Sequence, residues 1–244
     1  ELLQQMKSRM EMSIFDMGHA LAAGRVSSYF SKAGKYAEKL KGLEYYWFIS
    51  EILEDFDKNK EEIISNLNKV YREIFNINNL IIAFTGDKED FAVIKDNLNI
   101  ITDNLNTNTW KAKEYNFPKS KLNEGILSSA NVQYVSKGYN FKDLGYEYSG
   151  KMAVLSTILS RDYLHNRIRA QGGAYGAGIS FGQTGLVTTF SYRDPNLTET
   201  IEVYDNMADY IENLNLNEED LNTYIIGTIS HLDPAITPPG KGAL

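Results

Sequence analysis

The residues best suited to chemistry stand on either side of a glycine pair. Arg169 and Tyr175 flank Gly172 and Gly173 in the run RAQGGAYGAG, and Gly176 follows directly. A permanently charged guanidinium and a phenol hydroxyl that project toward one point can grip a peptide carbonyl or stabilise an oxyanion. The same residues also suit a structural role, because an arginine in the last turn of a helix meets the negative end of the helix dipole and a tyrosine packs well beside a sheet. The residue types alone leave both interpretations open.

A helix and a hairpin must position this pair. Tyr163, Leu164 and Ile168 recur at helical spacing, and the glycine pair predicts the end of that helix at a position that needs positive φ. Two extended runs, residues 174–182 and 186–193, surround a Gln-Thr-Gly turn and predict a β-hairpin. The predicted bend between helix and hairpin brings Arg169 and Tyr175 to opposite sides of one corner.

Other sites of chemistry are disfavoured by the sequence. None of the three histidines, His19, His165 and His231, has the H-x-x-E-H or H-E-x-x-H neighbourhood of a zinc site. The glycines of residues 172–182 lack the Gly-Lys-Ser/Thr ending of a P-loop, and they lead from helix to strand, the reverse of a dinucleotide-binding turn. We therefore expect this chain to hold neither a metal nor a nucleotide.

Composition narrows the class of protein. The 244 residues, 43% of them hydrophobic, can form one large core or two small ones. A net charge of -7 without a basic block argues against nucleic acid as a partner, and zero cysteines fit a reducing compartment such as the cytoplasm. Apolar runs such as residues 80–84 are far too short to span a membrane, so we expect no membrane partner. Because the chain starts at Glu1 instead of Met, we expect it to be a piece of a longer protein.

Apolar periodicity predicts an α+β fold in two parts joined by a linker. The first part, residues 1–105, is expected to contain helices over 3–21, 60–75 and 89–105 and a buried strand over 79–85. The polar, asparagine-rich residues 106–123 predict the linker. The second part, residues 124–244, is expected to contain a strand over 131–137, helices over 144–170 and 197–214, the hairpin, and a helix that begins at Asn217. This order predicts an antiparallel sheet covered by helices.

Three longer runs carry a family resemblance. YLHNRIRAQGGAYGAG, FSYRDPNLTETIEVYD and IIGTISHLD resemble the C-terminal half of the presequence-protease branch of the pitrilysin (insulinase-like) zinc metallopeptidases. The upstream runs AAGRVSSYFSKAGKYAEKLKGLEYYWFISEI and NNLIIAFTGD are similar to that branch as well. The resemblance extends over residues 13–242, and the string R-x-x-G-G-A-Y-G is much more specific than a lone glycine motif.

The resemblance implies a fold and a division of labour. Proteins of this family enclose a chamber between two halves, each made of two similar α+β repeats, and the N-terminal half holds the zinc and the water-activating base. The C-terminal half contributes an arginine and a tyrosine to the substrate, which fall here on Arg169 and Tyr175, with Gly172, Gly173 and Gly176 beside them. The implied partners are an unstructured peptide and the N-terminal half of the same polypeptide, and the zinc ligands would lie outside this chain.

Two further expectations follow from the resemblance. The two parts of the chain would be incomplete pieces of adjacent repeats, and we expect them to complement one another by packing together. The alternative to a peptidase is a non-catalytic relative, a structural or peptide-binding subunit that has kept the fold.

Overall fold

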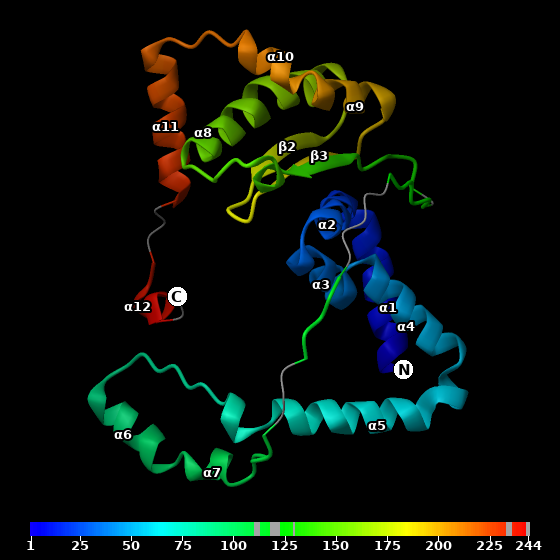
Figure 1. The fold of residues 1–244 in the computed structure, drawn as a ribbon, viewed down its shortest axis with the longest axis vertical. Coiled ribbons are helices and arrows are strands. Elements are labelled where there is room, and N and C mark those ends of the chain that lie inside the picture. The colour runs from blue at the N-terminus through cyan, green and yellow to red at the C-terminus, as the bar shows by residue number, and fades with distance from the viewer. Residues whose placement is uncertain (110–112, 118–122, 129, 233–235, 243–244) are drawn as a thin grey trace. The chain divides into compact units, whose positions relative to one another are not determined.

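The computed structural model describes residues 1–109, 113–117, 123–128, 130–232 and 236–242. Contacts within it define two units. Unit 1 consists of Glu1–Leu53 and Asn116–Leu232, and unit 2 consists of Glu54–Tyr115 and Asp233–Leu244. Figure 1 shows the elements of both units, which are described one at a time.

Unit 1 is built around a three-stranded antiparallel sheet. Its strands are β1 (Ser136–Asn140), β2 (Gly176–Phe181) and β3 (Leu186–Tyr192), in the order β1-β3-β2. A turn at positive φ, Gly185 at +100°, joins β2 to β3 in the predicted hairpin. A short 3-10 helix, η2 (Phe141–Leu144), follows β1.

Helices from the second half of the sequence cover one face of this sheet (Figure 1). They are α8 (Lys151–Ile158), the π-helix η3 (Leu159–Gln171) that continues it, α9 (Thr198–Asp205), α10 (Met207–Glu212) and α11 (Glu218–Leu232). The core lies between η3, α9 and the sheet and consists of Val135, Leu159, Tyr163, Leu164, Ile168, Ala174, Ile179 and Tyr204. Asn217 caps α11 as predicted, because its side-chain oxygen accepts a hydrogen bond from the Asp220 N–H at 2.8 Å.

Helices from the start of the chain belong to the same unit. They are α1 (Leu2–Asp16), α2 (Gly18–Phe30), α3 (Lys32–Lys41) and α4 (Leu43–Glu54). Helix α2 packs on β1 and β3, where a Cβ on Gly138 would come within 2.7 Å of the Val26 side chain. The contact is what the complementation hypothesis requires, and that the two parts are pieces of adjacent repeats stays a prediction.

An ionic cluster reinforces this packing. The guanidinium of Arg25 on α2 donates to Glu124 at 2.6 and 2.8 Å, to Glu44 at 3.0 Å and to Glu38 at 3.3 Å. The Tyr29 hydroxyl also donates to Glu124, at 2.6 Å. The hydrogen bonds from Arg25 and then from Tyr29 outweigh the effect of burial and lower the pKa of Glu124 to about 2. The cluster therefore connects residues on both sides of the long polar segment.

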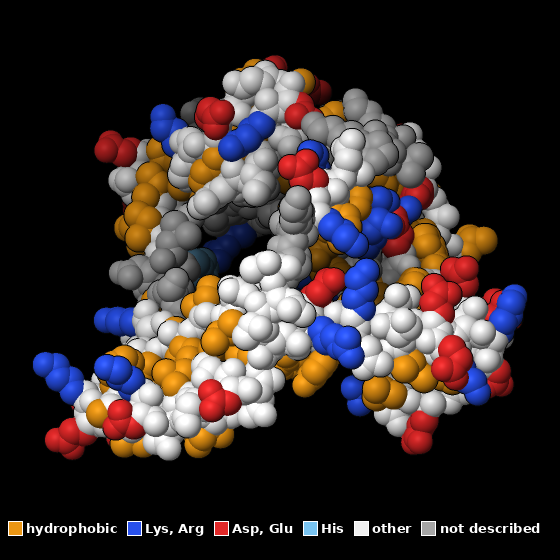
Figure 2. All heavy atoms as spheres, turned by 60° about the horizontal axis from the view of Figure 1, so that its bottom comes forward, with side chains coloured by type: hydrophobic (Ala, Val, Ile, Leu, Met, Phe, Trp, Pro, Cys, Tyr) orange, Lys and Arg blue, Asp and Glu red, His pale blue; other side chains and the backbone are white. Residues whose placement is uncertain are grey.

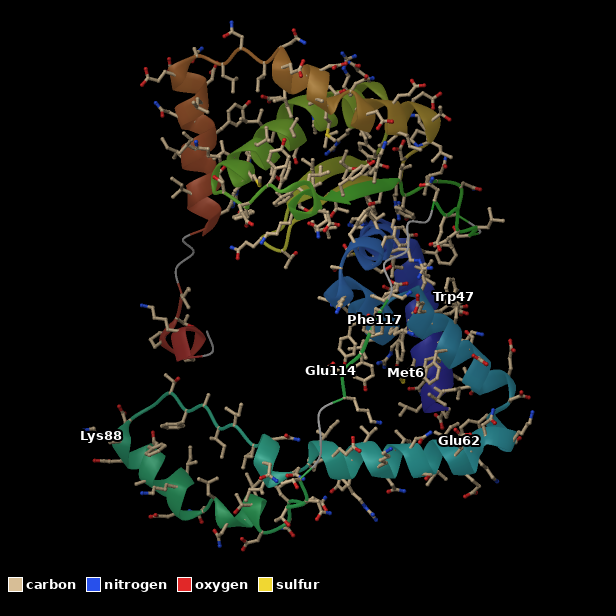
Figure 3. All side chains as sticks on the ribbon, viewed as in Figure 1. Met6, Trp47, Glu62, Lys88, Glu114 and Phe117 are labelled. Atoms are coloured by element: carbon tan, nitrogen blue, oxygen red, sulfur yellow. The ribbon has the colours of Figure 1, made fainter. Side chains whose placement is uncertain are left out.

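Unit 2 is helical and leaves many apolar side chains at its surface. It contains α5 (Phe56–Ile74), η1 (Ile77–Asn79), α6 (Lys88–Asp96), α7 (Asn99–Thr102) and α12 (Pro238–Gly242). Figure 2 shows hydrophobic side chains at the surface among charged ones, and Figure 3 labels Glu62 on α5 and Lys88 at the start of α6. Exposed apolar residues on α5 and after it include Ile64, Leu67, Val70, Tyr71, Ile74, Phe75 and Ile81.

The fold class is confirmed, and several element boundaries are corrected. The structure is α+β, with an antiparallel sheet covered by helices. The expected buried strand over 79–85 is wrong, because residues 80–85 form no helix or strand and Ile81 is 91% exposed. The expected helix over 3–21 is broken at Met17, whose φ of -119° and ψ of 27° are not helical. Predicted strand 131–137 begins later, at Ser136, since only an isolated bridge from Gln133 to Asp194 precedes it.

Three more helices differ in extent. The helix predicted over 144–170 begins at Lys151, and those predicted over 89–105 and 197–214 are each divided into two shorter helices. Residues 110–112 and 118–122 of the expected linker lie outside the described residues, and the expected boundaries at 105 and 124 stay a prediction. Within the described ranges, no helix combines the length and apolar character needed to cross a membrane.

Candidate functional site

The corner that carries the candidate pair begins at the end of a π-helix. Helix η3 ends at Gln171, the Gly173 N–H donates to the Arg169 carbonyl at 3.0 Å, and the Ala174 N–H donates to the Ile168 carbonyl at 3.0 Å. Gly173 has φ +80°, which confirms the predicted left-handed end of the helix. The wider turns of a π-helix are frequent at functional sites, and here they immediately precede Arg169 and the corner.

Gly172 serves the corner in a different way from Gly173. Its φ is -83°, an ordinary helical value, but a Cβ at this position would meet the Ile168 carbonyl oxygen at 2.6 Å. Gly176 starts β2 opposite Tyr192 of β3, where a Cβ would make only an ordinary contact of 3.8 Å. The glycine pair is therefore required by backbone geometry, while Gly176 is not.

Arg169 and Tyr175 lie together at the surface. The guanidinium carbon of Arg169 is 5.9 Å from the centre of the Tyr175 ring, within the range of a cation–π contact. The Tyr175 residue is 68% exposed, so it does not pack into the core beside the sheet. Neither side chain forms a hydrogen bond or an ion pair that ties up its donors, as far as the described residues go. The structure thus brings together the two residues that the sequence predicted.

A row of aromatic rings continues from Tyr175 and was not predicted. The Tyr192 ring lies 6.1 Å from the Tyr175 ring, 5.8 Å from the Tyr134 ring and 4.8 Å from the His19 ring. His19 is on α2, its Nδ1 is buried without a hydrogen-bond partner among the described residues, and burial lowers its pKa. No local motif marks this row, because it is assembled from three separate segments of the chain.

A second arginine lies over this row. The guanidinium carbon of Arg193 is 5.6 Å from the centre of the Tyr192 ring. Arg193 has φ +49°, the single positive φ among the described non-glycine residues. The sequence placed it at the end of the predicted strand 186–193 and gave no sign of this conformation. A positive φ in a non-glycine residue often accompanies a functional site.

The described residues do not fit a zinc centre. They contain no group of three or more histidine, aspartate or glutamate side chains that could hold a metal ion. His19 faces aromatic rings, while His165 and His231 are exposed on η3 and α11. Two surface hollows, one lined by Arg72 and Asn76 and one lined by Lys137 and Tyr204, include neither member of the candidate pair. The corner is therefore an open surface that could form one wall of a site.

Comparisons with known proteins match the two sequence segments of unit 1. Residues 123–244 match the family model described as "PreP C-terminal domain". Residues 1–52 match a second model, described as peptidase-associated and belonging to the same subfamily of peptidases. The matched ranges include the corner and the helix that packs on the sheet, whereas residues 53–122 fall between them.

Full-length relatives agree with the family models. The chain is 41% identical over 242 residues to Protein HypA of Clostridium perfringens, which covers 99% of this chain and 25% of the relative. It is 32% identical over 249 residues to Presequence protease 1, chloroplastic/mitochondrial, of Arabidopsis thaliana, covering 99% and 23%. It is 26% identical over 257 residues to the mitochondrial presequence protease of Saccharomyces cerevisiae, covering 99% and 26%. The chain thus spans about a quarter of the length of these relatives, and it belongs to the presequence-protease family of peptidases, of which it represents a C-terminal portion.

Proposed function

We propose that this chain supplies the substrate-side wall of a zinc-dependent peptidase that degrades unstructured peptides. Arg169 and Tyr175 bind the carbonyl group of the peptide bond that is cleaved, while the zinc ion and the general base lie in a part of the whole protein outside this chain. One observation carries the proposal: the Arg169 guanidinium lies 5.9 Å from the exposed Tyr175 ring at a glycine corner.

The two side chains suit the charge that develops during peptide hydrolysis. Attack of water on the carbonyl carbon turns the carbonyl oxygen into an oxyanion, which is stabilised by donors that are already in place. The Arg169 guanidinium keeps its charge at all relevant pH values, and the Tyr175 hydroxyl donates one neutral hydrogen bond. The contact between guanidinium and ring restrains both side chains before the substrate arrives.

The corner also allows a peptide backbone to come close. Gly172, Gly173 and Gly176 present no side chain between Arg169 and β2, so an extended chain can approach the backbone there. We propose these glycines as substrate-contacting positions. Closure of another part of the protein over this surface would exclude water and complete the site. The names of the plant and yeast relatives, both presequence proteases, support a peptide as the substrate. The expected cytoplasmic location remains a prediction.

The test is steady-state kinetics of the full-length protein on an unstructured peptide, with zinc removed by a chelator and then restored. Arg169→Ala and Tyr175→Phe are each expected to lower kcat by about 10²–10³, the usual cost of one lost oxyanion donor. Arg161→Ala and Tyr146→Phe are matched controls, because both residues are exposed and neither belongs to the corner.

Two outcomes contradict this proposal. A full-length protein that is inert with zinc present, yet binds the peptide, would be a non-catalytic peptide-binding or structural relative. Zinc-dependent hydrolysis that Arg169→Ala and Tyr175→Phe leave as fast as the controls would remove the two residues from the active site.

A further inference from the structure

A β-bulge places Arg193 beside the candidate site. Ser136 pairs with Phe190 in the β1–β3 ladder, and the next antiparallel bridge joins Gln133 to Asp194. Three residues on the β3 side, Ser191 to Arg193, therefore face only Tyr134 and Val135 on the other side. The extra residue defines a bulge, a feature that often re-aims a side chain next to an active site.

The backbone conformation of Arg193 has a cost that local packing does not offset. A left-handed φ of +49° costs a residue with a Cβ about 1–2 kcal/mol, and glycine would avoid that cost. Arg193 is exposed, so its side chain fills no core position that would require an arginine. Strained positions that persist in such surroundings are good candidates for function.

The environment of Arg193 leaves its charge available. The guanidinium carbon lies 5.6 Å from the Tyr192 ring centre, and no ion pair formed between described residues includes Arg193. The adjacent carboxylate of Asp194 is fully buried, where it accepts hydrogen bonds from the Asn196 N–H at 2.9 Å and the Thr200 hydroxyl at 2.7 Å. A guanidinium stacked on a ring still presents the N–H groups along its edge, which match the two oxygens of a carboxylate.

Arg193 is within reach of the same extended peptide as Tyr175. The Tyr192 ring lies between them, 6.1 Å from the Tyr175 ring and 5.6 Å from the Arg193 guanidinium carbon. Because an extended peptide advances about 3.3 Å per residue, those two steps correspond to at most about three to four residues of substrate. A group on the substrate a few residues from the bond held at Tyr175 would therefore meet Arg193.

We propose that Arg193, stacked on Tyr192, is a specificity-determining residue that binds a carboxylate of the substrate peptide a few residues from the cleaved bond. The inference rests on the proposed function, since it extends the same site. Either the C-terminal carboxylate or an acidic side chain of the peptide has the required chemistry, and the two sources are separated by the test.

The test measures binding to the full-length protein with zinc chelated, so that no peptide is cleaved. Three fluorescent peptides share one sequence without Asp or Glu: the first ends in an amide, the second ends in a free carboxylate, and the third ends in an amide and carries a single Glu. Fluorescence anisotropy gives Kd for each. Wild type is expected to bind at least one carboxylate peptide about tenfold more tightly than the neutral peptide, and whichever peptide it prefers identifies the source.

Variants separate the role of Arg193 from a structural one. Arg193→Gly accepts the positive φ and removes the guanidinium, so it is expected to fold at least as well as wild type and to reduce the tenfold preference to about one. Arg193→Lys is expected to keep part of the preference as a point charge, and Arg161→Ala, at another exposed arginine, is expected to keep it all.

The outcomes of the binding test differ from those of the kinetic test. A wild type without preference, or an Arg193→Gly variant that keeps the full preference, would overturn the inference. Equal loss in Arg161→Ala would also overturn it, because overall charge would then explain the binding. A protein that shows the Arg193-dependent preference but no hydrolysis retains this carboxylate site and loses the proposed peptidase function.

Discussion

At the scale of single residues, backbone conformation separates glycines that look alike in the sequence. Gly173 has φ +80° at the corner, although a Cβ there would meet only the Pro195 side chain, at 3.7 Å. Gly227 lies inside α11, and a Cβ there would have open space around it. The first position favours glycine for its conformation, while the second has no such need.

Substitution by alanine is expected to have opposite effects at these two positions. Gly173→Ala is expected to lower the free energy of unfolding by about 1–2 kcal/mol, because alanine is strained at positive φ. Gly227→Ala is expected to raise it by about 0.5–1 kcal/mol, because alanine loses less backbone entropy in a helix. Urea unfolding of both variants against wild type measures the two changes, and changes of the same sign would contradict the assignment.

The candidate pair was predictable at this scale, and its surroundings were not. Arg169 and Tyr175 belong to one continuous motif, so their proximity followed from a predicted helix end and a predicted strand. The aromatic row depends on Tyr134, Tyr192 and His19, which come together only after α2 has packed on the sheet. The positive φ of Arg193 depends on the pairing register, which a sequence pattern of alternating residues does not reveal.

At the scale of elements, the ionic cluster around Arg25 makes packing depend on pH. The depressed pKa of Glu124, about 2 compared with its usual 4.5, shows that the folded state favours the ionised carboxylate. Such a group contributes stability that is fully present above the unfolded pKa and is lost as the pH falls through the folded pKa.

We therefore expect the free energy of unfolding to decrease between about pH 5 and pH 2. The share due to Glu124 is about 1–2 kcal/mol, after allowance for solvent screening of a partly exposed side chain. Glu124→Gln is expected to reduce the slope of stability against pH in this range. Glu147→Gln, in an exposed ion pair with Lys142, is the control and is expected to leave the slope as it is in wild type. Equal slopes in wild type and Glu124→Gln would show that the cluster does not couple folding to this proton.

Elements were predicted best where they are stabilised by their own residues. The hairpin and α5 follow from local turn chemistry and from an apolar stripe, and both are present close to the expected bounds. The helix over 3–21 failed at Met17, where a close contact between Gly18 and the Tyr134 ring brings α2 onto the sheet. The strand over 79–85 failed because a strand needs a partner, and the described residues supply none beside it.

At the scale of the whole molecule, the apolar surface of unit 2 and its unpaired segment point to parts of the protein outside this chain. Within unit 2, Ile81 is almost fully exposed, and α5 carries a row of exposed apolar side chains. The relatives are about four times as long as this chain, so most of their residues have no counterpart here.

Amide hydrogen exchange can test whether the segment Leu80 to Phe84 acquires a partner. In the 244-residue chain, the amides of Ile81, Ile82 and Phe84 are expected to exchange rapidly, because no backbone hydrogen bond holds them among the described residues. In the full-length protein we expect their exchange to slow by at least about tenfold, since pairing or burial would protect them. The amides of β3, hydrogen-bonded on both sides, are the internal reference. Equally rapid exchange of the segment in both forms would show that it stays unpaired.

The arrangement of unit 1 also makes residues 54–115 a tether. Because Glu1–Leu53 and Asn116–Leu232 form one unit, a backbone break within 54–115 would turn an intramolecular contact into association between two peptides. The stability of unit 1 would then depend on protein concentration, as in any obligate dimer. In the intact chain, a closed loop through the Arg25–Glu124 contact, 99 residues apart, costs entropy that grows only slowly with loop length. Insertions or deletions within that tether would therefore change the stability of unit 1 far less than a single cut.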